Sequence, residues 1–205
     1  MWYFVRTPAI LRWVFRSCIW AKNQAESSVY LSFDDGPHPA VTPFVLDELK
    51  KWKAKATFFC IGENVRRYPE LFTRIAEEGH SIGNHTFHHL NGWQTKDELY
   101  IQDIHKAREV IPSTLFRPPY GKIRFAQLKQ IRKQIGLNVV MWSLLSGDFD
   151  QHISPEKCAQ NVIDNIRNGD IVVFHDSVKA MENLQYALPV VMKYLTDKGF
   201  VCKVL

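Results

Sequence analysis

The chain has 205 residues, of which 46% are hydrophobic and 13% aromatic, and its formal net charge is +5. This length and composition are typical of a single globular domain with a substantial core. The positive charge favours anionic partners through long-range attraction, but no basic tract or stripe points to a nucleic acid. Four cysteines lie far apart without a C-x-x-C pair, which argues against a thiolate zinc knuckle or a disulfide scaffold and favours buried free thiols.

Residues 1–27 are predicted to form an amphipathic N-terminal extension. Arginines interrupt each of its apolar runs before the run reaches the length of a signal peptide or a membrane span. Thr7-Pro8 is predicted to start a helix with two unlike faces, one carrying Ile10, Leu11, Val14, Phe15 and Cys18 and the other Arg12 and Arg16. This helix either makes peripheral contact with a membrane surface or packs against its own domain.

From residue 28 to residue 205, short apolar runs alternate with longer helical stretches. The predicted strands are Val29–Phe33, Ala56–Ile61, Ser81–Asn84, Thr114–Phe116, Asn138–Trp142, Asp170–Phe174 and Phe200–Val204. The predicted helices are Val41–Trp52, Pro69–Glu78, Lys96–Ile111, Ile123–Ile135, Pro155–Asn168 and Met181–Lys198. This order indicates a parallel sheet with right-handed crossovers, either open and doubly wound or closed into a barrel. We expect a barrel, because the polar clusters follow predicted strands, where barrel enzymes carry their catalytic groups.

Two adjacent carboxylates, Asp34 and Asp35, end the first predicted strand. Neighbouring side chains in a regular strand point to opposite faces, so both carboxylates reach one site only if the chain turns between or after them. Gly36-Pro37 ends the strand at once and supplies that turn. Taken alone, the stretch is also typical of a solvated Asx-type turn.

A second cluster places four histidines within residues 80–89. His85 and His89 are spaced i, i+4, so that on a helical turn both imidazoles would face one metal ion. His80 and His88 are expected to serve as supporting or packing residues. A catalytic metal site needs a third ligand and a position open to water, and one aspartate of the Asp34-Asp35 pair can supply that ligand while the other acts as a general base.

Two further clusters supply possible partners for these groups. Arg117, in a loop stiffened by two prolines, is placed to hold an aspartate, and a backbone N–H of the same loop can bind a developing oxyanion. His175 follows the predicted strand Asp170–Phe174 and suits a general acid, because histidine titrates near neutrality and a carboxylate can keep it protonated. Read separately, a surface arginine and a structural histidine explain these two residues better than the functional roles do.

Together these segments resemble the polysaccharide deacetylase family, carbohydrate esterase family 4, also called the NodB homology domain. The resemblance covers residues 28–205 and implies a distorted (β/α) barrel of seven or eight strands. It implies a metal-dependent hydrolase that removes N-acetyl groups from N-acetylglucosamine units of peptidoglycan or chitin-like oligomers. The implied roles are Asp34 as base, Asp35, His85 and His89 as metal ligands, Arg117 as the residue orienting Asp34, and His175 as acid paired with Asp148.

The resemblance also implies a role for the Tyr120 amide at the oxyanion and for Val173 in the pocket for the acetyl methyl group. The family usually has tryptophan after the aspartate of its fourth motif, whereas Phe149 follows Asp148 here. Phenylalanine keeps an apolar wall but lacks the indole N–H and some area, which bears on the shape of the acetyl pocket.

Zinc is the expected metal, with cobalt or nickel as substitutes. We expect a monomer that acts on an acetylated polysaccharide and does not bind nucleic acid. The family suggests the cell envelope, although no cleavable signal is evident. The alternatives are a non-catalytic carbohydrate-binding relative, a deacetylase of O-acetyl esters, and an iron oxygenase with two histidines and one carboxylate.

Overall fold

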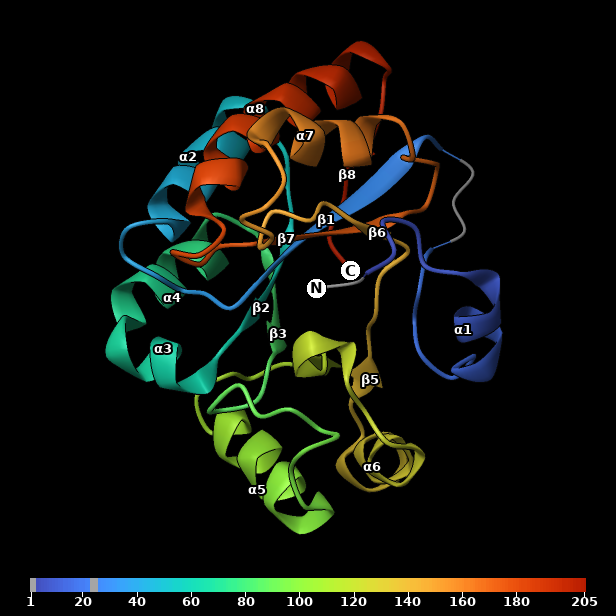
Figure 1. The fold of residues 1–205 in the computed structure, drawn as a ribbon. Helices are drawn as coiled ribbons and strands as arrows, with labels where there is room; N and C mark the ends of the chain where they lie inside the picture. The colour runs from blue at the N-terminus through green and yellow to red at the C-terminus, as the bar shows by residue number, and fades with distance from the viewer. Residues whose placement is uncertain (1–2, 23–25) are drawn as a thin grey trace.

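A computed structural model describes residues 3–22 and 26–205, in which helices surround a curled central sheet (Figure 1). The strands are β1 (Ser28–Asp34), β2 (Thr57–Cys60), β3 (Ser81–Asn84), β4 (Leu115–Phe116), β5 (Asn138–Val139), β6 (Leu144–Leu145), β7 (Ile171–His175) and β8 (Val201–Cys202). The α-helices are α1 (Ala9–Val14), α2 (Thr42–Lys51), α3 (Gly62–Arg67), α4 (Pro69–Glu77), α5 (Asp97–Arg108), α6 (Phe125–Gln130), α7 (Pro155–Ile163) and α8 (Met181–Asp197). A 3₁₀ turn, η1 (Pro119–Gly121), and a π-helical turn, η2 (Ile131–Ile135), complete these elements.

The strands pair in the order β5-β4-β3-β2-β1-β7-β6, and β8 pairs with β1 beyond this path. All of these pairings are parallel. The sheet curls so that its carboxyl edge gathers the loops after β1, β3, β4 and β7, which confirms the predicted distorted (β/α) barrel. Because β5 and β6 end the sheet, the barrel is open between them.

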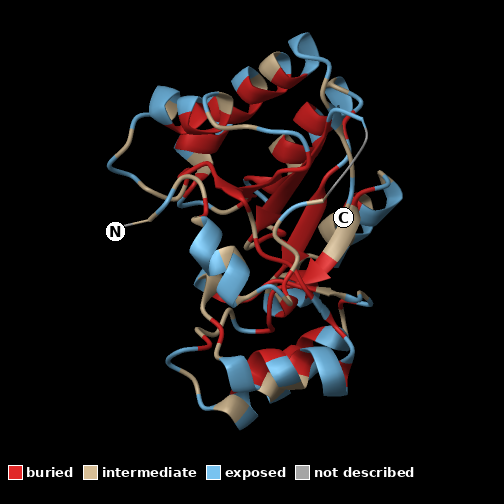
Figure 2. Cartoon of the chain, turned by 90° about the vertical axis from the view of Figure 1, so that its right-hand side faces the viewer, coloured by how far each residue is buried: buried red, intermediate tan, exposed pale blue. Residues whose placement is uncertain are grey.

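The two faces of β1 serve different purposes. Val29, Leu31 and Phe33 belong to the main hydrophobic core, which includes buried residues of α2, α7 and α8. Phe33 stacks against the rings of Phe58 and Phe174 in the two neighbouring strands, at centroid distances of 5.1 and 5.9 Å. Every residue of β1 is buried, and most of the central sheet is red in Figure 2. Because side chains alternate along a strand, Ser32 and Asp34 point to the opposite face, into the barrel, where they can form part of a site.

The N-terminal segment, residues 3–22, lies beside the open side of the barrel. Leu145 donates its N–H to the carbonyl of Val5 at 2.8 Å, and Met141 donates to the carbonyl of Ile19 at 2.7 Å. These bonds lie next to β6 and β5, the two ends of the sheet. The Arg6 guanidinium also pairs with the Asp170 carboxylate at 2.5 Å. The segment thus packs against its own sheet, although its helix α1 has no buried residue.

The structure differs from the sequence predictions at several elements. The N-terminal helix is only Ala9–Val14, and Thr7 does not cap it, because its hydroxyl donates to the Trp142 carbonyl at 2.8 Å. The predicted helix Ile123–Ile135 is shorter and ends in the π-helical turn η2. The strand β6 and the helix α3 were not predicted, since two residues give no periodicity and α3 is short and polar.

The cysteines agree with the expectation of buried free thiols. Cys18, Cys60 and Cys158 are buried free thiols, and Cys202 is a half-buried one. Among the described residues, no helix has both the length and the apolar character needed to cross a membrane.

The Arg6–Asp170 pair gives a test of how firmly the N-terminal segment is held. Arg6→Ala leaves a nearly buried Asp170 carboxylate without its cation, so we expect the free energy of unfolding to fall by about 2–4 kcal/mol. Denaturant unfolding followed by circular dichroism measures the change. Arg16→Ala is the matched control, since Arg16 is exposed and should change stability by less than about 0.5 kcal/mol. Equal stability of the two variants would show that the pair does not hold the segment.

Candidate active site

Asp35, His85 and His89 come together at the carboxyl edge of the sheet. The Asp35 carboxylate lies 3.1 Å from Nε2 of His89 and 3.6 Å from Nε2 of His85. One ligand atom from each residue lies within 4.8 Å of the others, which is an arrangement that can hold a metal ion. Two imidazole nitrogens and one carboxylate oxygen form a donor set suited to zinc and leave room for further ligands. The residues present therefore fit a catalytic divalent cation.

Asp35 reaches this cluster because the backbone turns at that residue. Asp35 follows the last residue of β1 and has φ of 80°, a left-handed conformation that takes it out of the strand alternation. Gly36 then donates its N–H to Asp176 at 3.0 Å. A Cβ at position 36 would lie 2.0 Å from an Asp176 oxygen, so only glycine fits there.

The two histidines do not lie on a helical turn, which corrects the sequence prediction. They lie in a loop after β3, in which Thr86 and His89 have φ of 64° and 55°. Their rings nevertheless lie 5.1 Å apart between centroids. The i, i+4 spacing thus selected two histidines that do lie together, but left-handed loop backbone brings the imidazoles together.

This loop is fixed by side chains that the sequence analysis missed. One Asp103 oxygen accepts the N–H groups of Phe87 and His88 at 2.8 and 2.9 Å, and its other oxygen contacts Nδ1 of His88. The Asn84 side chain accepts the N–H of Thr86 at 2.8 Å. Asp103 lies on the buried face of α5, and a carboxylate on such a face was the signal available in the sequence.

The protonation states of the cluster suit metal binding. The Arg117 carbonyl lies 2.7 Å from Nδ1 of His85, so Nδ1 carries the proton and Nε2 is free to bind a metal. Burial lowers the pKa of His85 to about 4, against the opposing pull of Asp34. Burial alone would raise the pKa of Asp35, but the hydrogen bond with His89 and the charge of His175 hold that pKa well below its usual range. A neutral imidazole and an ionised carboxylate are the ligand forms of these residues.

Arg117 is fully buried and holds Asp34 from inside the barrel. Its Nη1 donates to the Asp34 carboxylate at 2.7 Å and to the Ser32 hydroxyl at 2.8 Å. Its Nη2 donates to the Met141 carbonyl at 3.0 Å, and its guanidinium carbon lies 4.0 Å from the centroid of the Phe59 ring. Burial lowers the pKa of Arg117, and the Asp34 carboxylate opposes this shift. The position and orientation of the Asp34 carboxylate are thereby fixed.

His175 and Asp148 form a second pair across the site. In the parallel register of β1 and β7, His175 stands beside Asp34. The Asp148 carboxylate lies 2.8 Å from Nδ1 of His175 and also accepts the backbone N–H of His175 at 2.6 Å. Burial alone would lower the pKa of His175. The fully buried Asp148 carboxylate has a stronger opposite effect and raises this pKa to about 9. His175 is therefore held protonated near neutral pH.

The remaining predicted residues surround these pairs. The Tyr120 ring lies 4.6 Å from the His89 ring, and its backbone has φ of 60°. The Phe149 ring stands edge-on to the His175 ring at 5.2 Å. Val173 is buried in β7 two residues before His175, so both side chains leave the strand on the same side. The structure thus brings all ten predicted site residues to one edge of the barrel.

One contact comes from a segment to which the sequence analysis gave no part in the site. The Tyr3 ring lies edge-on to Phe149 at a centroid distance of 5.2 Å. The Tyr3 hydroxyl lies 2.7 Å from the place where a Cβ at Gly147 would stand, so Gly147 allows this close approach. The N-terminal segment therefore supports the aromatic wall formed by Phe149.

A family model for polysaccharide deacetylases matches residues 21–140. The chain belongs to the polysaccharide deacetylase family. It is 37% identical over 187 residues to a peptidoglycan-N-acetylglucosamine deacetylase of Bacillus cereus, covering 88% of this chain and 87% of the relative. It is 37% identical over 163 residues to a chitooligosaccharide deacetylase of Azorhizobium caulinodans, covering 75% of this chain and 76% of the relative.

The fold agrees with this membership. A crystal structure of a peptidoglycan N-acetylglucosamine deacetylase in complex with 4-naphthalen-1-yl-N-hydroxybenzamide superposes with a TM-score of 0.88 at 33% identity, covering 97% of this chain and 95% of that chain. The protein is thus a polysaccharide deacetylase, a hydrolase of a metal-dependent family, and its Asp35-His85-His89 cluster is the candidate metal site.

The metal site can be tested without any substrate. His85→Ala removes one of three donors, so we expect zinc affinity to fall by about 100-fold or more. Isothermal titration calorimetry of the metal-free protein measures this affinity. His152→Ala removes an exposed histidine outside the Asp35-His85-His89 cluster and should leave zinc affinity unchanged. Zinc binding that survives His85→Ala at full strength would place the metal elsewhere.

Proposed function

We propose that the protein removes acetyl groups from N-acetylglucosamine units of a polysaccharide, with peptidoglycan as its main substrate. The observation that carries this proposal is the arrangement of three candidate ligands between two charged pairs, Asp34–Arg117 and His175–Asp148. Such a site offers a base and an acid on either side of one metal position. The net charge of +5 and the near full-length similarity to a peptidoglycan deacetylase support an anionic wall polymer over neutral chitin-like oligomers.

Asp35, His85 and His89 would hold the metal, and zinc is the ion that this donor set suits best. Cobalt or nickel can replace it, because the ligand geometry discriminates poorly between these ions. A cation bound there would act as a Lewis acid toward water and the acetyl carbonyl.

Asp34 acts as the general base in this proposal. It takes a proton from the attacking water, which requires the carboxylate to be ionised and correctly oriented. The charge-assisted hydrogen bond from Arg117, at 2.7 Å, favours the ionised form and fixes the orientation. Asp34 and Asp35 thus take different roles although they are neighbours in the chain.

The other groups act on the acetyl carbon and on the leaving amine. The Tyr120 amide donates a hydrogen bond to the acetyl carbonyl oxygen as that oxygen becomes an oxyanion. Val173 and Phe149 line the pocket for the acetyl methyl group. His175, kept protonated by Asp148, gives its proton to the sugar nitrogen as the carbon–nitrogen bond breaks. The products are acetate and a glucosamine unit.

We also propose that residues 28–205 form the catalytic domain and residues 1–27 an extension, and that the enzyme acts as a monomer. Every group assigned to the reaction comes from one chain, which supports the monomer. All of these groups belong to residues 34–175.

Acetate release tests the proposed activity directly. The zinc-loaded protein should release acetate from peptidoglycan and, more slowly, from chitooligosaccharides, and it should release less from small O-acetyl esters. Asp34→Asn should keep one zinc per chain while kcat falls by about 100-fold or more, because only the base is lost. No acetate from any N-acetylated glycan, under conditions in which a known family member is active, would exclude the proposal.

The pH dependence of kcat tests the acid. His175 must be protonated to act, so kcat should fall as the pH rises through the pKa of His175, which Asp148 raises. Asp148→Asn removes the largest of the effects that raise this pKa, so the alkaline limb of the pH profile should move to lower pH by about one unit or more. An alkaline limb at the same pH in both proteins would show that a different group is titrating.

A further inference from the structure

The N-terminal segment carries an apolar surface that the described part of the chain leaves exposed. We call this surface the N-terminal patch and define it by five side chains with exposed fractions of 63% for Ile10, 40% for Leu11, 70% for Trp13, 39% for Val14 and 47% for Phe4. In Figure 1 the helix α1 stands apart from the helices that cover the sheet, and it has no buried residue. Large exposed apolar patches on soluble proteins often mark interaction sites.

The patch continues to the rim of the candidate active site. Phe15 of the N-terminal segment stacks on Phe125 at a centroid distance of 4.7 Å, and Phe125 is itself 61% exposed. Phe4 and Leu11 share a cavity of about 220 Å³ with Tyr120, whose ring contacts His89. The apolar surface and the opening of the site therefore adjoin each other.

Basic residues accompany the apolar ones, and acidic residues do not. Residues 1–25 contain three arginines and one lysine and no aspartate or glutamate before Glu26. Arg6 is paired with Asp170. Across residues 3–22 and 26–205, Arg12, Arg16 and Lys22 have no ion-pair partner. The segment thus presents unneutralised cations beside hydrocarbon.

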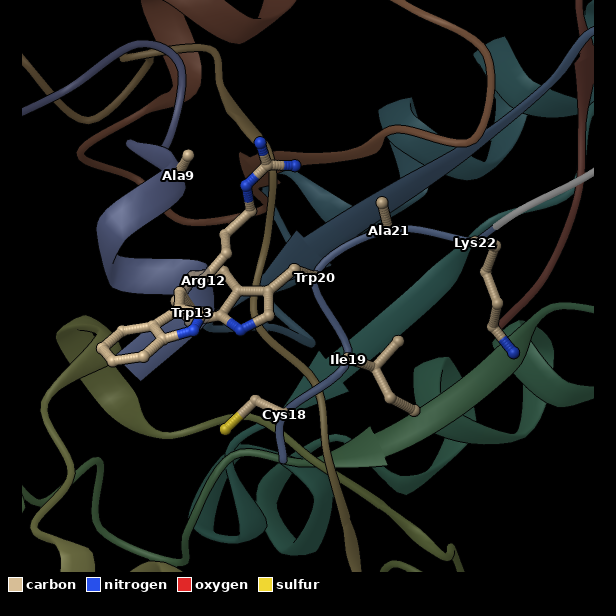
Figure 3. A pocket seen from close by; sticks show the side chains of 8 residues that line it. All are labelled: Ala9, Arg12, Trp13, Cys18, Ile19, Trp20, Ala21 and Lys22. Carbon is tan, nitrogen blue, oxygen red and sulfur yellow. The ribbon is translucent and has the colours of Figure 1, made fainter. Parts of the chain in front are cut away.

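An open hollow beside α1 combines both kinds of group. It has a volume of about 690 Å³, and Arg12, Trp13, Trp20 and Lys22 are among its lining residues. Figure 3 shows Arg12 next to the two indoles, with Lys22 toward the other end. Within the described part of the chain, the buried Nε of Arg12 has no hydrogen-bond acceptor. Cations and indoles together suit the interface of a lipid bilayer, where phosphate groups lie above the hydrocarbon.

We propose that the N-terminal patch docks on an anionic lipid bilayer. The apolar side chains enter the boundary between headgroups and acyl chains, and Arg12, Arg16 and Lys22 meet lipid phosphates. A second copy of this chain fits less well, because a symmetric contact would bring the unpaired cations of two segments together. The contact in this proposal is peripheral, because the apolar side chains reach only the boundary between headgroups and acyl chains. If the proposed function holds, the glycan that this enzyme deacetylates lies close to a membrane surface.

Vesicle co-sedimentation tests the proposal with the zinc-loaded full chain. We expect binding to vesicles of equimolar phosphatidylcholine and phosphatidylglycerol, weaker binding to phosphatidylcholine alone, and weakening by salt. Ile10→Ser with Trp13→Ser should reduce the partition coefficient by about 10-fold or more, because two apolar insertions are lost. Arg12→Gln with Arg16→Gln should reduce it by about 10-fold on the anionic vesicles only.

The matched control is Tyr186→Ser with Val190→Ser, two exposed apolar residues of α8 that should leave binding unchanged. Acetate release from a soluble chitooligosaccharide should be equal in all of these variants, which separates membrane docking from the proposed activity. Absence of binding to anionic vesicles, or equal binding by the patch and control variants, would overturn the proposal. The proposal would also be overturned if the protein forms dimers without lipid and Ile10→Ser with Trp13→Ser dissociates them, because the patch would then join two copies.

Discussion

A single buried arginine links the two halves of the candidate active site. The Arg117 side chain holds the carboxylate of Asp34, while the Arg117 carbonyl orients the imidazole of His85. A guanidinium with no exposed surface is costly unless a carboxylate and further acceptors surround it, and in this fold Asp34, Ser32 and the Met141 carbonyl do so. The proposed base and one proposed metal ligand are therefore both held by the same residue.

The parallel sheet supplies the rest of the geometry. Adjacent registers put Asp34 beside His175, and the inward alternation of β1 puts Ser32 and Asp34 on the face where Arg117 lies. The candidate metal ligands lie beyond the ends of the strands and outside this regular pattern. Asp35 and His89 both need left-handed backbone to reach the site, and buried carboxylates at Asp176 and Asp103 hold the turns that place them. Regular structure thus positions the proposed acid and base, and loops with left-handed backbone position the proposed metal ligands.

Most of this arrangement could be predicted from the sequence, because apolar runs followed by polar clusters locate the carboxyl edge of a parallel sheet. The residues of each cluster were identified in this way, and the family pattern supplied their expected roles. The local backbone conformation was harder to predict from the sequence. The i, i+4 spacing of His85 and His89 implied a helix where a loop exists, because spacing alone does not distinguish the two. Asp103 was missed because it lies far from its loop in the chain and within a predicted helix.

The N-terminal segment was the hardest part to predict. Its amphipathic pattern left two interpretations open, membrane contact or packing within the domain, and the structure shows packing on both sides of an exposed helix. Backbone bonds of Val5 and Ile19 join the segment to the edges of the sheet, and Tyr3 supports Phe149. The helix between these contacts remains exposed. Hydrophobic periodicity does not reveal that the residues before and after α1 pack against the sheet while the helix itself stays exposed.

The most direct test of the role of Arg117 is a double-mutant cycle on kcat with Asp34→Asn and Arg117→Gln, each protein loaded with zinc. If Arg117 acts through Asp34, the double variant should be no slower than the slower single variant, because the two residues work as one unit. Loss factors that multiply in the double variant would show that the two residues act independently, and this result would contradict the central role of their contact.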